Sequence, residues 1–198
     1  PARRALLQVA AGTRLTTKRL SQEEIDMRTG QLLFGFVAAL AVSAPPVSAA
    51  QTPKVKAAPN GIEFPAGYQD WPVISSSHRI DNNTLRVIVG NDVAVAAART
   101  GQTNPWPDGA ILGKLVWKQG AKDSWPQAIA PAAFVHAEFM FKDAARYVAN
   151  GTGWGWARWV GMDQTPYGDN ADFGRECIAC HSPVKANDWV FTLPAQLP

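Results

Sequence analysis

Side chains that bind a metal through sulfur or an imidazole nitrogen are scarce in this sequence. Cysteine occurs twice, histidine three times and methionine three times among 198 residues. Both cysteines lie in the segment Cys177-Ile-Ala-Cys180-His181. The other two histidines, His78 and His136, therefore have no second cysteine pair with which to form a four-ligand site. A structural zinc site needs four ligands. The shortage therefore disfavours structural zinc and leaves residues 177–181 as the main candidate site.

A hydrophobic run long enough to cross a bilayer is also missing near the start. The apolar run at residues 32–42 is about half the roughly 20 residues that a membrane helix needs. It follows Arg28 and precedes small residues ending near Ala50, which is the pattern of a secretory signal. A buried core helix is disfavoured because two prolines follow the run. We expect residues 27–50 to be a cleaved signal peptide, residues 1–26 an upstream leader, and the mature protein to be periplasmic without a membrane span.

The part after the expected signal peptide has no net charge. Six of the 19 basic and three of the 16 acidic residues lie in residues 1–50, which leaves 13 of each. Without a positive excess there is no electrostatic case for nucleic acid binding. Export would also place the cysteines in an oxidising compartment, where such a pair closes into a disulfide or carries a cofactor.

The pattern of apolar residues predicts an α+β fold dominated by β-strands. Glycine-rich phosphate loops and repeats are absent, which favours an antiparallel sheet with flanking short helices and a C-terminal CxxCH segment. Strands are expected where β-branched or alternating apolar residues occur, at 83–91, 110–118, 132–142 and 154–160. Helices are expected at 91–100 and 143–150, with a short helix or turn around 68–71 and a last strand or extended tail at 188–194.

The spacing of the cysteine motif is that of c-type haem attachment. Two thiols add to the two vinyl groups of haem, and the adjacent imidazole becomes an axial ligand of the iron. A thioredoxin-type dithiol would lie in a βαβ pattern, which is not predicted here. The motif therefore predicts haem c bound through Cys177 and Cys180, with His181 on the iron; a redox dithiol or disulfide remains the alternative.

The identity of a sixth iron ligand would separate two functional classes. An electron-transfer cytochrome usually supplies a second strong ligand, often Met or His. His136 lies in an apolar strand, where a hydrogen-bonded core histidine is the commoner outcome, and His78 lies in a serine-rich stretch. Neither is a compelling ligand. An iron that is open on one side binds or transforms a small molecule.

Three expected strands each contain one ionisable residue within an apolar run: Arg86, Lys114 and Glu138. Each could point to solvent from a half-exposed sheet. A buried charge without a partner would cost several kcal/mol, so buried residues of this kind are paired, shifted in pKa or chemically used. A buried lysine tends towards the neutral amine, which is a nucleophile.

At this point the sequence resembles the cytochrome P-460 family and its relative cytochrome c′-beta. The resemblance covers most of residues 64–198, which we expect to form a haem domain after a flexible linker at 51–63. Its most specific parts are Asp108-Gly109 followed by Lys114, and the CxxCH motif followed by Asp188 and "VFT". The resemblance implies secreted, β-rich haem proteins that are commonly homodimers, that oxidise hydroxylamine and that have been associated with nitric oxide chemistry.

The resemblance also implies roles for individual residues. In P-460 members a lysine forms a third covalent bond, to a meso carbon of the haem. One position departs from the family: Arg175 stands two residues before the first cysteine, where a family member has a small residue. If the Arg175 side chain covered the open face of the iron, it would alter substrate access. By position, the implied roles are thioethers at Cys177 and Cys180, proximal ligand at His181, cross-link at Lys114, distal proton-relaying carboxylate at Glu138 and pocket arginine at Arg86.

Three functions follow from these expectations. The first is a hydroxylamine or nitrogen-oxide oxidoreductase that delivers electrons to an external acceptor. The second is a nitric oxide-binding protein without turnover, which a hydrophobic distal pocket lined by Phe134, Phe139 or Phe141 would favour. The third is an electron carrier, for which no sixth ligand is evident.

Overall fold

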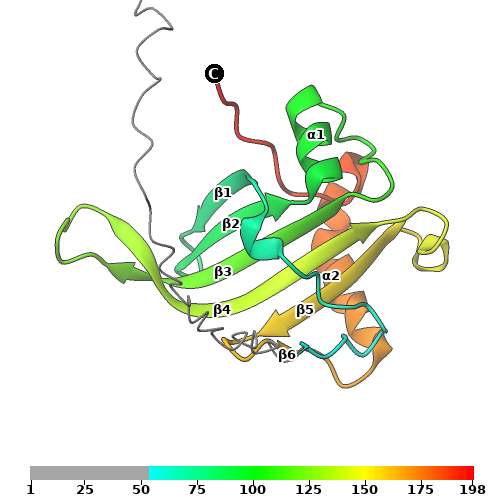
Figure 1. The fold of residues 1–198 in the computed structure, drawn as a ribbon, viewed down its shortest axis with the longest axis horizontal. Coiled ribbons are helices and arrows are strands. Elements are labelled where there is room, and N and C mark those ends of the chain that lie inside the picture. Colours follow the sequence, from blue (N-terminus) through cyan, green and yellow to red (C-terminus); the bar gives the residue numbers. More distant parts are fainter. Residues whose placement is uncertain (1–53) are drawn as a thin grey trace, which may run out of the picture. The chain divides into compact units, whose positions relative to one another are not determined.

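The computed structural model describes residues 54–198 and builds them around a six-stranded antiparallel sheet. The expected leader, signal peptide and first linker residues lie outside the described residues. Each strand lies beside its neighbour in the chain, in the order β1-β2-β3-β4-β5-β6 (Figure 1). The β-dominated α+β class is confirmed. The strands are β1 (Val73–Arg79), β2 (Thr84–Gly90), β3 (Ile111–Ala121), β4 (Ile129–Lys142), β5 (Trp154–Val160) and β6 (Thr165–Pro166).

The helices of the described residues are short. Helix α1 begins after Asn91, whose side chain accepts a hydrogen bond from the Ala94 N–H at 3.0 Å, and ends at Gly101 in the left-handed conformation. The predicted helix at 91–100 is therefore confirmed. The helices are α1 (Asp92–Thr100) and α2 (Gly174–His181), with 3-10 turns η1 (Tyr68–Asp70), η2 (Val148–Asn150), η3 (Ala171–Phe173) and η4 (Ser182–Asn187).

Most sequence-based strand predictions are confirmed, and the exceptions have physical reasons. Strand β1 was not predicted because its serines, residues 75–77, give it no apolar alternation; it lies at the sheet edge, where one face stays exposed. The predicted helix at 143–150 is wrong over most of its length, since only η2 is helical and the rest is turn. Of the two alternatives predicted for residues 188–194, the strand is absent: residues 188–189 form a turn and residues 190–194 a tail without regular structure. After this tail the Ala195 N–H donates to the Ile74 carbonyl at the sheet edge.

The β3–β4 hairpin extends beyond the rest of the sheet. Strand β2 starts at Thr84, opposite Lys118, whereas β3 and β4 continue pairing as far as Ala121 and Ile129. The hairpin consequently projects from the sheet in Figure 1.

One face of the sheet, called here the packed face, is covered by the segment that precedes β1. Side chains alternate between the two faces of a strand, so Phe139 of β4 and Trp159 of β5 both point to this side. Their rings meet edge to face at 5.9 Å, and Phe64 packs on both. The buried residues of this face are Ala58, Ile62, Tyr68, Ala137, Phe139, Ala157, Trp159 and Phe173.

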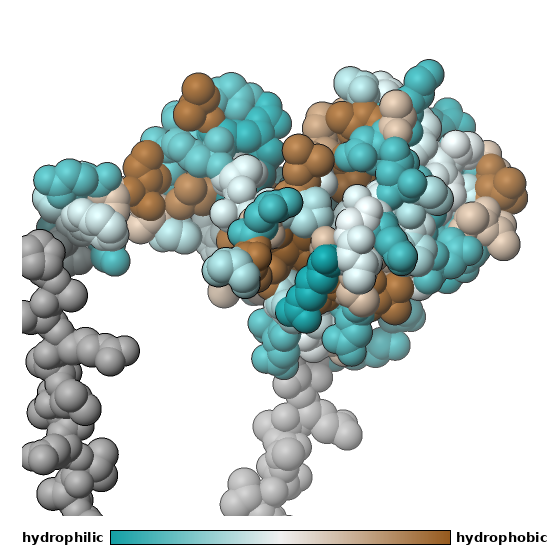
Figure 2. Space-filling model, turned by 90° about the horizontal axis from the view of Figure 1, so that it is seen from above, coloured by the Kyte–Doolittle hydropathy of each residue, from teal (hydrophilic) through white to brown (hydrophobic). Residues whose placement is uncertain are grey.

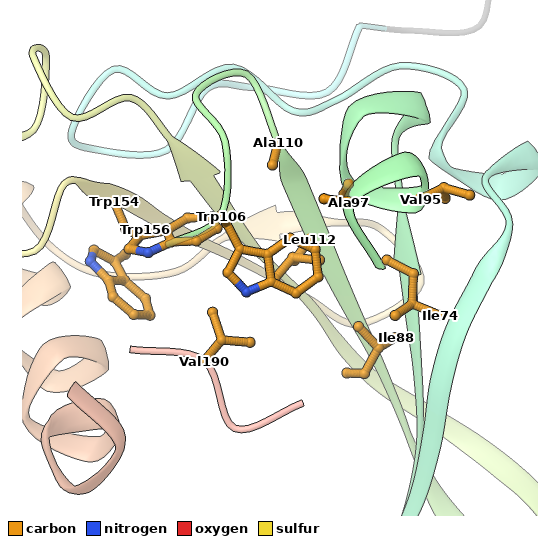
Figure 3. Close-up of a cluster of buried hydrophobic side chains, with 11 residues drawn as sticks. Ile74, Ile88, Val95, Ala97, Trp106, Ala110, Leu112, Trp154, Trp156 and Val190 are labelled. Carbon is orange, nitrogen blue, oxygen red and sulfur yellow. The ribbon is translucent and has the colours of Figure 1, made fainter. Parts of the chain in front are cut away.

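The opposite face, called the site face, has a tryptophan-rich core at one end. Trp106, Trp154 and Trp156 lie close to Val190 of the C-terminal segment, as Figure 3 shows. Helix α1 packs on the same core through Ala94, Val95 and Ala97. The remainder of this face is not filled by apolar side chains and carries the site described below.

In the view of Figure 2, apolar residues form separate small patches among polar ones and no broad apolar patch. Isolated apolar residues of this kind are normal for a protein surface. Among residues 54–198, no helix has the length and apolar character needed to cross a membrane.

Candidate functional site

The antiparallel register places three charged residues in one row across the site face. Ile88 of β2 is opposite Lys114 of β3, Lys114 is opposite Glu138 of β4, and Glu138 is opposite Arg158 of β5. Directly paired residues share a face and lie within side-chain contact. Residues from four strands are thus brought together although they are far apart in sequence.

Glu138 lies between the two cations of this row. One carboxylate oxygen contacts the Lys114 ammonium, and the other accepts a hydrogen bond from Arg158 Nε at 2.5 Å. Burial raises the pKa of Glu138, but the positive charges of Lys114 and Arg158 outweigh it and lower that pKa to about 2. Glu138 is therefore a carboxylate at neutral pH. Its side chain is only 17% exposed, so the solvent-facing alternative does not apply.

His136 is the neighbour of Glu138 on the same face. Its Nε2 is 3.4 Å from a carboxylate oxygen of Glu138. Burial lowers the pKa of His136 to about 4, so the imidazole is neutral at pH 7 and the contact is not an ion pair. The other spare histidine, His78, is exposed and bonds Gln119.

A cavity of about 750 Å³ lies in front of this row. Its volume is within the range of small-molecule and cofactor sites, roughly 300–1,000 Å³. Sheet residues form one side, and the end of α2 and the C-terminal segment form another. Its lining includes Ser75, Arg79, Arg86, Ile88, Leu112, Lys114, Glu138, Met140, Cys180, His181, Val190 and Phe191.

The structure brings five of the six predicted site residues to this cavity. The exception is Cys177, which is partly buried against both cores instead of lining the cavity. Cys177 lies one helical turn before Cys180 and His181 in α2, so the three side chains share one side of the helix. Both thiols are free. Burial raises the pKa of Cys177 to about 11, the opposite of the lowered pKa that a redox dithiol uses.

His181 is oriented by a backbone carbonyl. Its Nδ1 lies 2.7 Å from the Trp189 carbonyl oxygen. Because a carbonyl only accepts, Nδ1 carries the proton and Nε2 keeps a free lone pair, the arrangement found in metal-binding histidines. Burial lowers the pKa of His181, which favours this neutral form. The ring packs edge to face between Trp156 and Phe191.

Arg86 lines the same cavity and has one donor without a partner among the described residues. Its Nε is buried and has no hydrogen-bond partner among the described residues. Burial, with the nearby charge of Arg79, lowers the pKa of Arg86. Buried polar atoms are normally hydrogen-bonded, so this unsatisfied donor makes Arg86 a candidate to bind an acceptor oxygen of a ligand or cofactor.

Sequence reasoning missed one member of the charged row and assigned three phenylalanines to the wrong face of the sheet. Arg158 was overlooked, although it is a lone charge in an apolar strand like the three residues that were chosen. The expectation of a pocket lined by Phe134, Phe139 or Phe141 is wrong, because these rings belong to the packed face. Phe139 and Phe141 alternate with Glu138 and Met140 along β4, and Phe134 follows a shift in the β3–β4 register between Val116 and Trp117.

Arg175 does not reach the cavity. Its side chain is 83% exposed and its guanidinium lies 3.5 Å from Asp172, one turn earlier in the chain. It is absent from the lining of the cavity. The substitution of a small residue by Arg175 therefore does not cover the site in this structure.

Together, the fold and the cavity define a β-sheet protein whose pocket is lined by Cys180, His181 and Arg86, with Cys177 one helical turn before Cys180 in the CxxCH helix. Those residues fit a single haem. The sequence model of the Cytochrome P460 family matches residues 65–192, and the chain belongs to the cytochrome P460 family. The resemblance described above is confirmed, and membership implies a haem cofactor. A search of the curated proteins found no match.

Proposed function

We propose that this protein is an exported single-haem oxidoreductase that acts on hydroxylamine or a related small nitrogen compound. In this proposal Cys177 and Cys180 bind the haem covalently and His181 Nε2 is its axial ligand. The observation that carries the proposal is the position of Glu138: a largely buried carboxylate lines the same cavity as His181, whose Nε2 is free.

When bound, the haem supplies an iron that takes electrons from a small ligand and passes them to an external acceptor. The protein must then remove protons, because oxidation of hydroxylamine to nitric oxide releases protons and electrons in equal number. Glu138 is ionised and lies on the cavity wall, so it is the residue placed to accept them. His136, neutral and in contact with Glu138, offers an onward acceptor.

Lys114 has two roles in this proposal. As an ammonium ion it contacts Glu138 and stabilises the carboxylate. A bond from Lys114 Nζ to the haem ring, as the family resemblance implies, would remove that positive charge. The pKa of Glu138 would then move upward, towards the range in which a carboxylate exchanges protons effectively near neutral pH. The cross-link would thereby make Glu138 a better base.

Arg86 would act on the ligand or cofactor instead of on protons. A guanidinium stays charged and supplies several donors in a fixed plane. Arg86 lines the cavity, and its Nε has no hydrogen-bond partner among the described residues, so an acceptor oxygen of a bound group would satisfy it. We assign Arg86 the role of orienting that oxygen.

A second candidate function is nitric oxide binding without turnover. The cavity wall also contains an apolar part formed by Ile88, Leu112, Met140 and Val190. A small neutral gas needs no proton acceptor and would be retained by such a surface. This candidate therefore depends on the apolar part of the wall, whereas the oxidoreductase depends on Glu138.

The test is acceptor reduction by the purified haem-loaded protein in the presence of hydroxylamine. We expect turnover by the native protein and a loss of roughly 10²-fold or more for Glu138→Gln, the typical contribution of a positioned acid or base. Glu63→Gln is the matched control, because Glu63 is an exposed carboxylate paired with Lys54 at 3.2 Å. Nitric oxide binding with no turnover would favour the second candidate, and full activity of Glu138→Gln would refute the proton role.

A further inference from the structure

A second ion pair, buried on the site face, takes no part in the charged row. Lys142 Nζ lies 2.7 and 2.8 Å from the two carboxylate oxygens of Asp188. Their side chains are only 7% and 11% exposed. Removing two charges from water is costly unless their hydrogen bonds are satisfied by good geometry. The pair therefore calls for an explanation beyond surface solubility.

Asp188 is hydrogen-bonded to the tryptophan-rich core through both its side chain and its backbone. Its carboxylate also accepts the Trp106 N–H at 2.8 Å, and its carbonyl accepts the Trp154 indole N–H at 2.9 Å. The Lys142 ammonium lies 5.0 Å from the centre of the Trp154 ring. Figure 3 shows Trp106 and Trp154 lying close to Val190, two residues after Asp188. The start of the C-terminal segment is thus held at several points.

The backbone at this point is strained. Asp188 and Trp189 have φ of 48° and 65°, both in the left-handed region that side chains other than glycine rarely adopt. Two successive residues of this kind, one of them a tryptophan, persist only when the surrounding structure holds them. The Lys142–Asp188 pair, together with a hydrogen bond from the Trp189 N–H to the Val184 carbonyl at 3.1 Å, provides that restraint.

The strained turn has a direct consequence for the site. It directs the Trp189 carbonyl oxygen to His181 Nδ1, at 2.7 Å. We propose that Lys142 and Asp188 are positioning residues for the proximal histidine: by fixing the turn at 188–189 they set the hydrogen bond that orients His181 and raises its basicity as an iron ligand. This inference rests on the proposed role of His181 as axial ligand.

The effect can be read on the iron–histidine bond. A hydrogen bond from Nδ1 makes the imidazole a stronger donor to the metal. If the turn relaxes, that hydrogen bond lengthens and the ligand becomes less basic. We therefore expect a lower iron–histidine stretching frequency in the ferrous protein and a higher midpoint potential, because a weaker donor stabilises the ferric state less.

The experiment measures both quantities, by resonance Raman spectroscopy and redox titration, on haem-loaded Lys142→Met and Asp188→Asn. Both variants should shift in the stated directions, and Lys142→Arg should largely restore the native values because it keeps the charge. Phe64→Ala is the control: it removes a ring from the packed face and lowers stability without touching the turn. Its two readouts should match those of the native protein.

Native values in both Lys142→Met and Asp188→Asn would overturn the inference, as would an equal shift in Phe64→Ala. If the charge-removing variants do not fold, Asp188→Glu keeps the charge but displaces the turn, and an unchanged stretching frequency in that variant would equally overturn it. Failure of the proposed axial role of His181 is distinguishable, because the native protein would then carry no haem or show no iron–histidine band.

Discussion

The two faces of the sheet are built from the same strands but have opposite compositions. On the packed face, Phe139 and Trp159 are 1% and 0% exposed and their rings meet edge to face. On the site face, the adjacent residues Glu138 and Arg158 form a charged contact beside a cavity. Because side chains alternate along a strand, one residue can stabilise the fold while its neighbour serves the site.

The difference also separates the sources of stability. Burial of large aromatic rings is the main favourable contribution to folding. A row of half-buried charges contributes less, since desolvation offsets much of the attraction between them. We therefore expect substitutions on the packed face to change the free energy of unfolding most, and substitutions on the site face to change chemistry and pH dependence.

Trp159→Ala should break the packed face and have the largest effect on stability. The indole is fully buried, and its N–H donates to the Lys56 carbonyl at 2.9 Å. Loss of such a ring costs about 3–5 kcal/mol of unfolding free energy. Denaturant unfolding of the haem-loaded protein measures the change. A loss below that of a surface substitution would show that this face does not carry the stability assigned to it.

Arg158→Met should have a smaller effect on stability and a visible effect on the site. Glu138 keeps Lys114 as a partner but loses a hydrogen bond to a charged group, worth about 1–3 kcal/mol. The pKa of Glu138 should rise because one of its two neighbouring cations is gone. Unfolding experiments and the pH dependence of hydroxylamine turnover check the two parts, and a stability loss as large as that of Trp159→Ala would contradict the comparison.

His136, on the site face, should make the free energy of unfolding depend on pH. The pKa of His136 is about 4 in the folded protein, against an ordinary value of 6.5, because of burial. Between those values the unfolded chain binds a proton that the folded chain does not. The free energy of unfolding should therefore fall as the pH decreases, by about 1–2 kcal/mol between pH 7 and pH 5.

The contribution of His136 is isolated by comparison with His136→Gln, which has no titrating ring at this position. The variant should lose less stability than the native protein between the same two pH values, as measured by urea unfolding. Equal pH dependence of the two proteins would show that the imidazole is protonated as readily in the folded state as in the unfolded state.

Arg175→Ala should have the smallest effect. Its exposed side chain makes one long contact with Asp172, and exposed ion pairs contribute about 0–1 kcal/mol. Unfolding free energy, ligand binding and turnover should all stay close to native values. A clear change in ligand-binding rate would place this side chain over the cavity and contradict the structure.

Local features of the fold could be predicted from the sequence more readily than its long-range pairing. The α1 helix follows from Asn91 and Gly101, and the central strands follow from their β-branched and aromatic residues. Strand β1 does not, because its serines carry no period-two signal and it is recognisable only by its pairing with β2.

The site was predictable in its members but not in its arrangement. A charge within an apolar run identifies Arg86, Lys114 and Glu138 individually, yet only the register shows that Lys114 and Glu138 are directly opposite each other. The Trp189 carbonyl beside His181 had no sequence signal, since a backbone group has the same chemistry in every residue. Its direction depends on a strained turn held by the distant residue Lys142.

The central claim is that one haem is held at the CxxCH helix in front of the Lys114–Glu138 row. Mass spectrometry of the intact haem-loaded protein and of its proteolytic peptides tests it most directly. The account predicts one haem bound to the peptide that contains Cys177 and Cys180, and linked in addition to the peptide that contains Lys114. A haem bound by the cysteines alone would show that Lys114 forms no cross-link and would favour nitric oxide binding without turnover. A protein without covalently bound haem would contradict the claim.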